Sequence, residues 1–175
     1  GPLIKEKVSY FLSARRTWLD LLLQLSQLMN YEDELTYGFW EINAKLNWKI
    51  DKTDRLFLSF YTGRDAFQQN ENNSFSGSDI NYKIQWGNLT SVLRWNHIFS
   101  NALFVNTSLS YSLYQQEYKN FIDQADNSYF RGYNYLNDLT LKSDFSYNIS
   151  NNHRFLFGYE ASKQLLSPEV VELKD

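Results

Sequence analysis

The residues of this chain that are best suited to chemistry are charged side chains that recur on one face of its predicted strands. In the segment 39–50, Glu41, Lys45 and Lys49 fall on positions of one parity, and Lys142 and Asp144 do the same near residue 145. Residues two apart in an extended strand point to one face, so these charges would line a single polar surface. Their mixed sign favours a hydrated surface that forms ion pairs over direct contact with a substrate.

Catalytic and metal-binding patterns are weak. The chain has two histidines, His97 and His153, and no cysteine. Neither paired-histidine metal spacing nor a Gly-x-Ser-x-Gly nucleophile turn occurs. The dipeptide Asn96-His97 could belong to a Ser/His site, but no acid or nucleophile stands beside it in the sequence. We therefore expect no enzyme activity, no metal site and no cofactor.

Composition points to β structure. Aromatic residues make up 18% of the 175 residues, whereas glycine and proline number only 7 and 2. The mean hydropathy is -0.52, and no run approaches the roughly 18 apolar residues of a membrane helix. A net charge of -3 without a block of Lys or Arg argues against nucleic acid as a partner.

A period of two predicts the strands. It is clearest at 39–50, where Trp40, Ile42, Leu46 and Trp48 oppose the charged set, and it returns at 103–114 and 139–149. The alternation changes phase at Gly87-Asn88, which predicts a β-bulge or tight bend there. The predicted strands are 8–16, 39–50, 55–62, 80–99, 103–114, 139–149 and 154–163.

The connections between these strands alternate in length. Tight polar turns are predicted at 51–54, 100–102 and 150–153, and long loops at 18–37, 63–79 and 115–137. Residues 19–29 of the first loop could form a short apolar helix. Short turns on one rim and long loops on the other are typical of an outer-membrane β-barrel.

Aromatic spacing favours a membrane barrel over a soluble one. Trp40 and Trp48 share a face eight positions apart. That is about 26 Å along the strand, near the height of an apolar band between two aromatic girdles. Further aromatics collect near the short turns, namely Phe57, Phe99, Phe104, Tyr147 and Phe155. The membrane-girdle candidates are Trp40, Trp48, Tyr147 and Phe155.

The predicted fold class is all-β, with about seven or eight antiparallel up-and-down transmembrane strands that form part of a larger barrel. An odd number of strands would send the chain ends to opposite rims, and open sheet edges are not tolerated in lipid. We therefore expect residues 1–175 to be a partial barrel domain without a plug domain. In this arrangement the lumen-facing candidates are Glu41, Lys45, Lys49, Lys142, Asp144 and Glu160.

Four segments carry strand motifs, at residues 1–17, 54–65, 86–99 and 103–114. The first looks like the first barrel strands, and the other three are similar to later strands, of the TonB-dependent outer-membrane receptors of Bacteroidetes-type bacteria. The resemblance implies the wall of a Gram-negative outer-membrane receptor for active nutrient uptake. It also implies as partners outer-membrane lipid, the rest of the barrel with its plug, TonB through an upstream region, and a surface lipoprotein.

Two other functional classes stay open on the sequence. The chain could be a passive structural or adhesive outer-membrane β-protein, or a soluble β-barrel or sandwich that binds a ligand. The transported substrate, whether glycan, peptide or metal chelate, is not specified by these residues. Total strand number and oligomeric state are equally unspecified.

Overall fold

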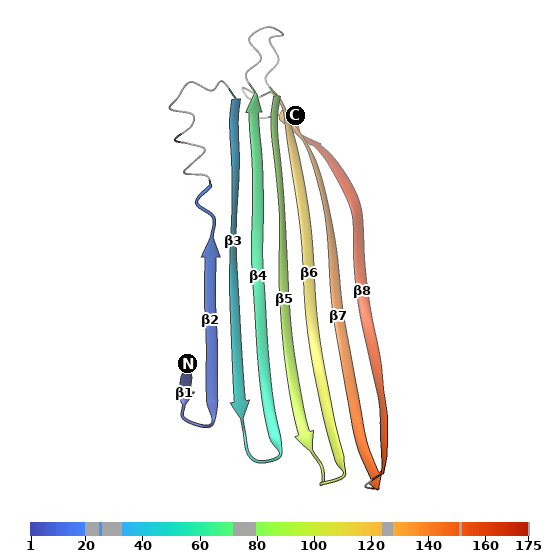
Figure 1. The fold of residues 1–175 in the computed structure, drawn as a ribbon. Coiled ribbons are helices and arrows are strands. Elements are labelled where there is room, and N and C mark those ends of the chain that lie inside the picture. Colours follow the sequence, from blue (N-terminus) through green and yellow to red (C-terminus); the bar gives the residue numbers. More distant parts are fainter. Residues whose placement is uncertain (20–24, 26–32, 72–79, 124–127, 151, 175) are drawn as a thin grey trace.

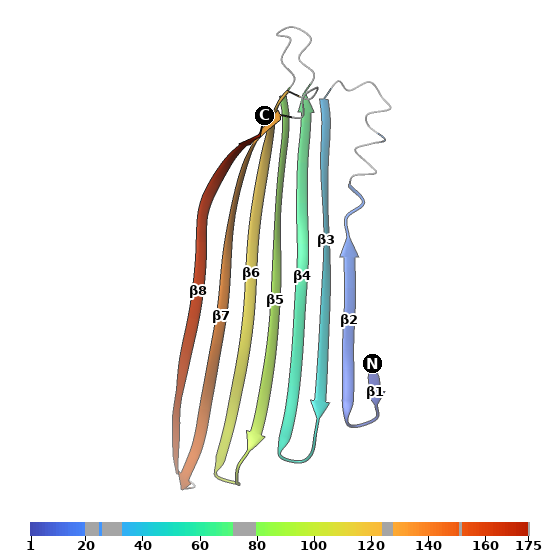
Figure 2. The same cartoon turned by 180° about the vertical axis from the view of Figure 1, so that it is seen from behind.

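The chain forms one β-sheet of eight strands in sequential order (Figure 1). The computed structural model describes residues 1–19, 25, 33–71, 80–123, 128–150 and 152–174. Figures 1 and 2 show a single curved layer, with short turns at one end of the strands. The strands are β1 (Pro2–Ile4), β2 (Val8–Arg16), β3 (Asp33–Lys49), β4 (Asp54–Glu71), β5 (Ile80–Ile98), β6 (Leu103–Asp123), β7 (Ser128–Ser150) and β8 (His153–Lys174).

Every strand pairs antiparallel with its neighbours in sequence, which confirms the all-β, up-and-down prediction. The strand count of about seven or eight is also confirmed. Within the described residues β1 and β8 do not pair with each other, so the sheet is open. One long edge of the sheet is therefore the outer side of β8.

The strands are longer than the sequence suggested. The loops predicted at 63–79 and 115–137 are largely strand, since β4 runs to Glu71, β6 runs to Asp123 and β7 begins at Ser128. Within the loop predicted at 18–37, β3 already begins at Asp33. The helix predicted at 19–29 lies mostly outside the described residues. No helix among the described residues has the length and apolarity to cross a membrane.

The bulge predicted at Gly87-Asn88 is wrong. Gly87 pairs with Arg64 and Gln115, Asn88 pairs with Gly63 and Tyr114, and the register stays regular through this part of β5. The backbone is continuous, so the change of phase is a change in where the apolar side chains lie. Among the described residues, register shifts occur instead in the β1–β2, β6–β7 and β7–β8 pairs.

A hydrophobic core is almost absent from the described part of the chain. Val105, with 2% of its surface exposed, is its one buried apolar residue, whereas large apolar side chains are exposed along β2 to β8. A second layer packed on the sheet would cover such side chains. Nothing in the described residues provides that layer.

Asp51 fixes the short turn between β3 and β4. Its Oδ1 accepts hydrogen bonds from the backbone N–H groups of Thr53 and Asp54, at 2.7 Å each, and from the Thr53 hydroxyl at 2.9 Å. The backbone N–H of Thr53 is the main reason that the pKa of the Asp51 carboxyl lies below its usual value of 3.8.

This hydrogen bonding predicts an acid-sensitive turn. A carboxyl whose pKa is lowered by folding stabilises the protein above its usual pKa and loses that contribution as the pH falls through the folded-state value. We expect acidification below about pH 4 to lower the urea midpoint of the wild type more than that of Asp51→Asn. Asparagine keeps the acceptor oxygen without titrating. Equal acid dependence in parallel tryptophan-fluorescence titrations would contradict the prediction.

Candidate functional site

Strand register assigns the sequence-predicted residues to two opposite faces of the sheet. We name these the Trp40 face and the Lys45 face. The four aromatic candidates, Trp40, Trp48, Tyr147 and Phe155, lie on the Trp40 face. The six charged candidates all lie on the Lys45 face, and these are Glu41, Lys45, Lys49, Lys142, Asp144 and Glu160.

The Lys45 face is polar near the short turns. Glu41 pairs with Arg15 at 3.1 Å, and Lys142 with Glu160 at 3.6 Å. Lys45, Lys49 and Asp144 form no ion pair with the described residues. Exposed pairs of this kind contribute at most about 1 kcal/mol each, so they solvate the surface more than they stabilise the fold.

Two of the aromatics that collect near the short turns lie on this polar face. Phe57 and Phe104 have the opposite parity to Trp40 in the register, so their position near the turns does not make them girdle residues. The Phe57 ring is covered by the guanidinium of Arg94, 4.3 Å from its centroid. Phe57 therefore belongs to a cationic surface.

The Trp40 face carries an exposed apolar band. Leu58, Leu93, Leu109 and Leu139 are 42 to 45% exposed, and Trp40 and Trp48 are similarly open at 42% and 44%. The hydroxyls on this face bond one another, for Ser143 lies 2.8 Å from Thr107 Oγ1 and donates to Tyr159 at 3.2 Å. The band thus presents apolar surface with few unsatisfied polar atoms.

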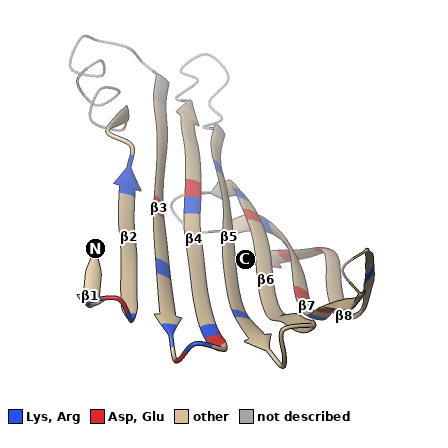
Figure 3. Ribbon diagram, turned by 60° about the horizontal axis from the view of Figure 1, so that its bottom comes forward, with Lys and Arg blue, Asp and Glu red and all other residues tan. Residues whose placement is uncertain are grey.

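The two faces exchange character along β3 to β7. Away from the short turns, half-buried aromatic and apolar side chains move to the Lys45 face, and charged ones to the Trp40 face. On β4, Figure 3 shows an uncharged stretch between the charged residues beside the short turn and a second charged group farther up the strand. The residues that move to the Lys45 face are Phe39, Phe67, Ile84, Trp86, Tyr118 and Phe130. The polar residues that replace them on the Trp40 face are Arg64, Lys83, Gln85, Glu117, Lys119 and Arg131.

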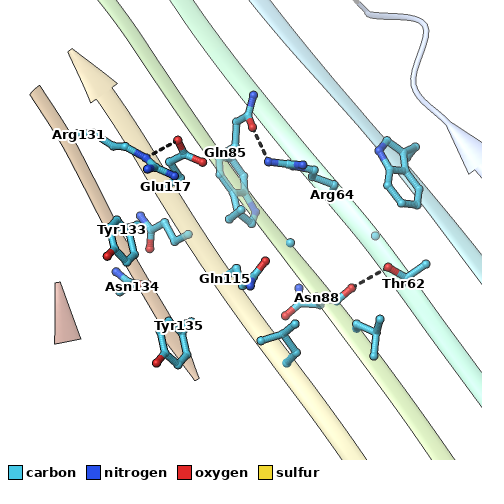
Figure 4. A pocket seen from close by; sticks show the side chains of 17 residues that line it. Thr62, Arg64, Gln85, Asn88, Gln115, Glu117, Arg131, Tyr133, Asn134 and Tyr135 are labelled. Atoms are coloured by element: carbon cyan, nitrogen blue, oxygen red, sulfur yellow. Dashed lines mark hydrogen bonds and ion pairs between the residues drawn. The ribbon is translucent and has the colours of Figure 1, made fainter. Parts of the chain in front are cut away.

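A hollow of about 350 Å³ lies on the Trp40 face where the apolar band ends (Figure 4). Gly87 contributes no side chain to it. Leu89 and Leu113 line its apolar side, and Arg64 and Gln85 line its polar side. Arg64 Nη2 donates to Gln85 Oε1 at 2.6 Å. We refer to this feature as the Gly87 hollow.

His97 has an acid partner that the sequence did not reveal. Its Nδ1 lies 2.7 Å from Asp54 Oδ1, which also accepts a hydrogen bond from Trp95 Nε1 at 2.8 Å. The His97 ring stacks on Trp95 at 5.1 Å and meets Phe99 edge-on at 4.4 Å. No hydroxyl among the described residues hydrogen-bonds to His97, so His97, Asp54, Trp95 and Phe99 form a cluster of aromatic rings around one acid at the rim of the sheet.

The described residues contain no group of three or more His, Cys, Asp or Glu placed to hold an ion. Neither the Gly87 hollow nor the exchange of character between the two faces was predicted from the sequence. The change in parity of the apolar side chains at residue 87 is the sequence feature that could have indicated both.

Comparisons with known proteins assign no family to the chain. No family model and no curated protein matches the chain. Among solved structures, the chain is similar to the CymD monoaromatic hydrocarbon channel at 11% identity, over 96% of this chain and 69% of that one, with a TM-score of 0.28. A likeness this distant does not assign a function.

Proposed function

We propose that this sheet is part of the wall of an outer-membrane β-barrel, with the Trp40 face against lipid. The observation that carries the proposal is the exposed leucine band on a sheet with a single buried apolar residue in its described part. Exposed apolar surface of this extent is unstable in water and stable against acyl chains. The soluble-sandwich alternative would need a covering layer.

The dimensions of the band agree with a bilayer. Trp40 and Trp48 bound it on β3, and residues eight apart in a strand are separated by about 26 Å. A tilt of about 40° leaves roughly 20 Å along the membrane normal, near the thickness of the apolar band of known barrels. Tyr147 and Phe155 are cross-strand partners beside the β7–β8 turn, where a second girdle is expected.

The Lys45 face fits a hydrated lumen. It carries the mixed charges of Glu41, Lys142 and Glu160, and the buried amide oxygens of Asn96 and Asn106 accept no hydrogen bond from the described residues. Polar groups of this kind need water or a polar partner. A plug domain inside the barrel would supply donors, and further strands of the same polypeptide would pair with the open edge of β8.

For the parent protein we propose active nutrient import as a TonB-dependent receptor, with no catalytic role for this sheet. The proposal rests on the strand motifs of residues 1–17, 54–65, 86–99 and 103–114 together with the two-faced wall. TonB, the plug and a surface lipoprotein would be its protein partners. The part of the Lys45 face that lies away from the short turns would border the mouth of the transport path.

Membrane residence can be tested on the full-length protein in its native cells. We expect the protein to stay in the outer-membrane fraction after a carbonate wash. We also expect faster migration on SDS gels before boiling than after it, as folded barrels resist SDS. A protein recovered in the aqueous fraction without detergent would refute the membrane assignment.

Active import can be tested separately. Deleting the gene should reduce growth on the limiting nutrient in cells with TonB and have no further effect in cells without it. A matched strain that carries the gene on a plasmid should recover growth only when TonB is present. A growth effect independent of TonB would favour a passive channel or adhesive protein and overturn the import proposal.

A further inference from the structure

We propose that the polar rim of the Gly87 hollow binds an outer-leaflet lipid with a net negative headgroup, through the phosphate of that headgroup. This inference rests on the proposed function, because it takes the Trp40 face to be the lipid-facing side. It adds a binding site to a wall that would otherwise contact lipid only through apolar side chains.

Three cations lie side by side above the hollow. In the strand register, Lys83 of β5 is opposite Lys119 of β6, which is opposite Arg131 of β7. We call these three residues the cation row. Cross-strand neighbours have Cβ atoms about 5 Å apart, and like charges at that separation repel. Such a row is stabilised by an anion that contacts several of its members.

Side chains of the protein neutralise the cation row only in part. Glu117 Oε1 accepts from Arg131 Nε at 2.9 Å and lies 3.3 Å from Lys119 Nζ, so one carboxylate serves two cations. Arg131 Nη1 also reaches Glu172 at 3.4 Å.

Lys83 and the nearby Arg64 form no ion pair with any described residue. Four cations therefore face two carboxylates, Glu117 and Glu172, and the local net charge is +2. The uncompensated charge lies on the β4–β5 side of the rim, next to the hollow.

The hollow places apolar and cationic groups as an amphipathic ligand would require. In the strand register, Leu89 and Leu113 lie on the side of Gly87 that continues into the apolar band, while Gln85 lies on the side that leads to Lys83 of the cation row. Figure 4 shows Arg64 beside Gln85 on this polar side. Gly87 keeps the space between them open, and a Cβ there would come within 3.1 Å of the Gly63 carbonyl oxygen. An acyl chain could follow the leucines while its phosphate meets the cations.

The position of the cation row favours a lipid over a soluble anion as the ligand. The row lies directly above the end of the apolar band, at the level where headgroup phosphates of the outer leaflet would lie. Arginine and lysine in this setting are phosphate ligands, and each contributes about 1 kcal/mol of attraction to an anionic membrane surface.

The test compares two double variants of the full-length protein with equal loss of charge. Lys83→Gln/Lys119→Gln removes two members of the cation row, and the control Lys45→Gln/Lys49→Gln removes two lysines from the opposite face. Detergent-purified, heat-modifiable protein is incubated with equal amounts of phosphatidylglycerol and phosphatidylcholine, and bound lipid is counted by native mass spectrometry.

We expect the row variant to lose about thirtyfold in its preference for phosphatidylglycerol and the control variant to keep it. If wild type and row variant preferred phosphatidylglycerol equally, or if the control variant lost as much preference as the row variant, the inference would be overturned. Neither result would contradict the proposal that the sheet is a barrel wall. Displacement of the lipid by equimolar inorganic phosphate would also overturn it, in favour of a soluble-anion site. A protein that is soluble without detergent would instead defeat the proposed function.

Discussion

Replacing Leu93 with arginine is expected to destabilise the protein by about 2–4 kcal/mol, as for a charge near the middle of a bilayer. Leu93 lies in the apolar band of the Trp40 face, 45% exposed, between Leu58 of β4 and Leu109 of β6. On a hydrated face, an exposed leucine could be replaced by arginine at almost no cost. Urea unfolding of the protein in lipid vesicles, followed by tryptophan fluorescence, measures the difference.

The matched control is Thr90→Arg on the same strand. Thr90 lies on the Lys45 face, opposite Tyr61 and Ser112, in the polar part of that face. We expect a change below about 1 kcal/mol there, since an arginine can remain hydrated in a lumen. If Leu93→Arg left the unfolding free energy unchanged and Thr90→Arg lowered it, the Lys45 face would be the one against lipid. That result would contradict the proposal that the Trp40 face meets lipid and the lipid site inferred on it.

Within one strand, the division of side chains between two faces could be predicted from the sequence, because an extended strand has a period of two. Trp40 and Lys45 differ in parity, so they point to opposite sides whatever the sheet packs against. The register was needed to join the candidate residues of β3, β7 and β8 into the two sets. Which side meets lipid depends on the surroundings of the sheet, and alternation alone carries no such information.

The ends of the strands could not be predicted in the same way. Residues 115–123 have aromatic and charged side chains on the faces opposite to those expected from 103–113, so the pattern appeared to stop at Tyr114. The backbone continues, because ladder hydrogen bonds form between main-chain groups whichever face is apolar. Under the proposed function, this reversal is the expected result of the Trp40 face passing from lipid to water.

The pairing of His97 with Asp54 shows a second limit. The two residues are 43 positions apart and meet only because β4 and β5 pair in one particular register. The register depends on the length of both strands and of the connection between them, which the sequence did not specify. The hydrogen bond to Asp54 therefore escaped a search confined to neighbouring sequence positions.

Gly158→Ala is expected to destabilise the sheet by about 1–3 kcal/mol, as do other changes that force extra volume into a packed site. A Cβ at Gly158 would lie 2.5 Å from the carbonyl oxygen of Ser143 and 3.0 Å from Asp144 Oδ1. Ser143 is 1% exposed, and its carbonyl belongs to the backbone of β7, so it cannot rotate away as a side chain could. The strands β7 and β8 would have to separate locally.

Gly38→Ala provides the control, because a Cβ at Gly38 has no atom within 4 Å. Alanine there removes backbone freedom from the unfolded chain and should leave stability unchanged or raise it by a few tenths of a kcal/mol. The two unfolding midpoints, measured in the same detergent, isolate the effect of the close approach at Gly158 from the general effect of replacing glycine. Equal midpoints would show that β8 is free to move away from β7, and the open edge would then be a loosely held strand.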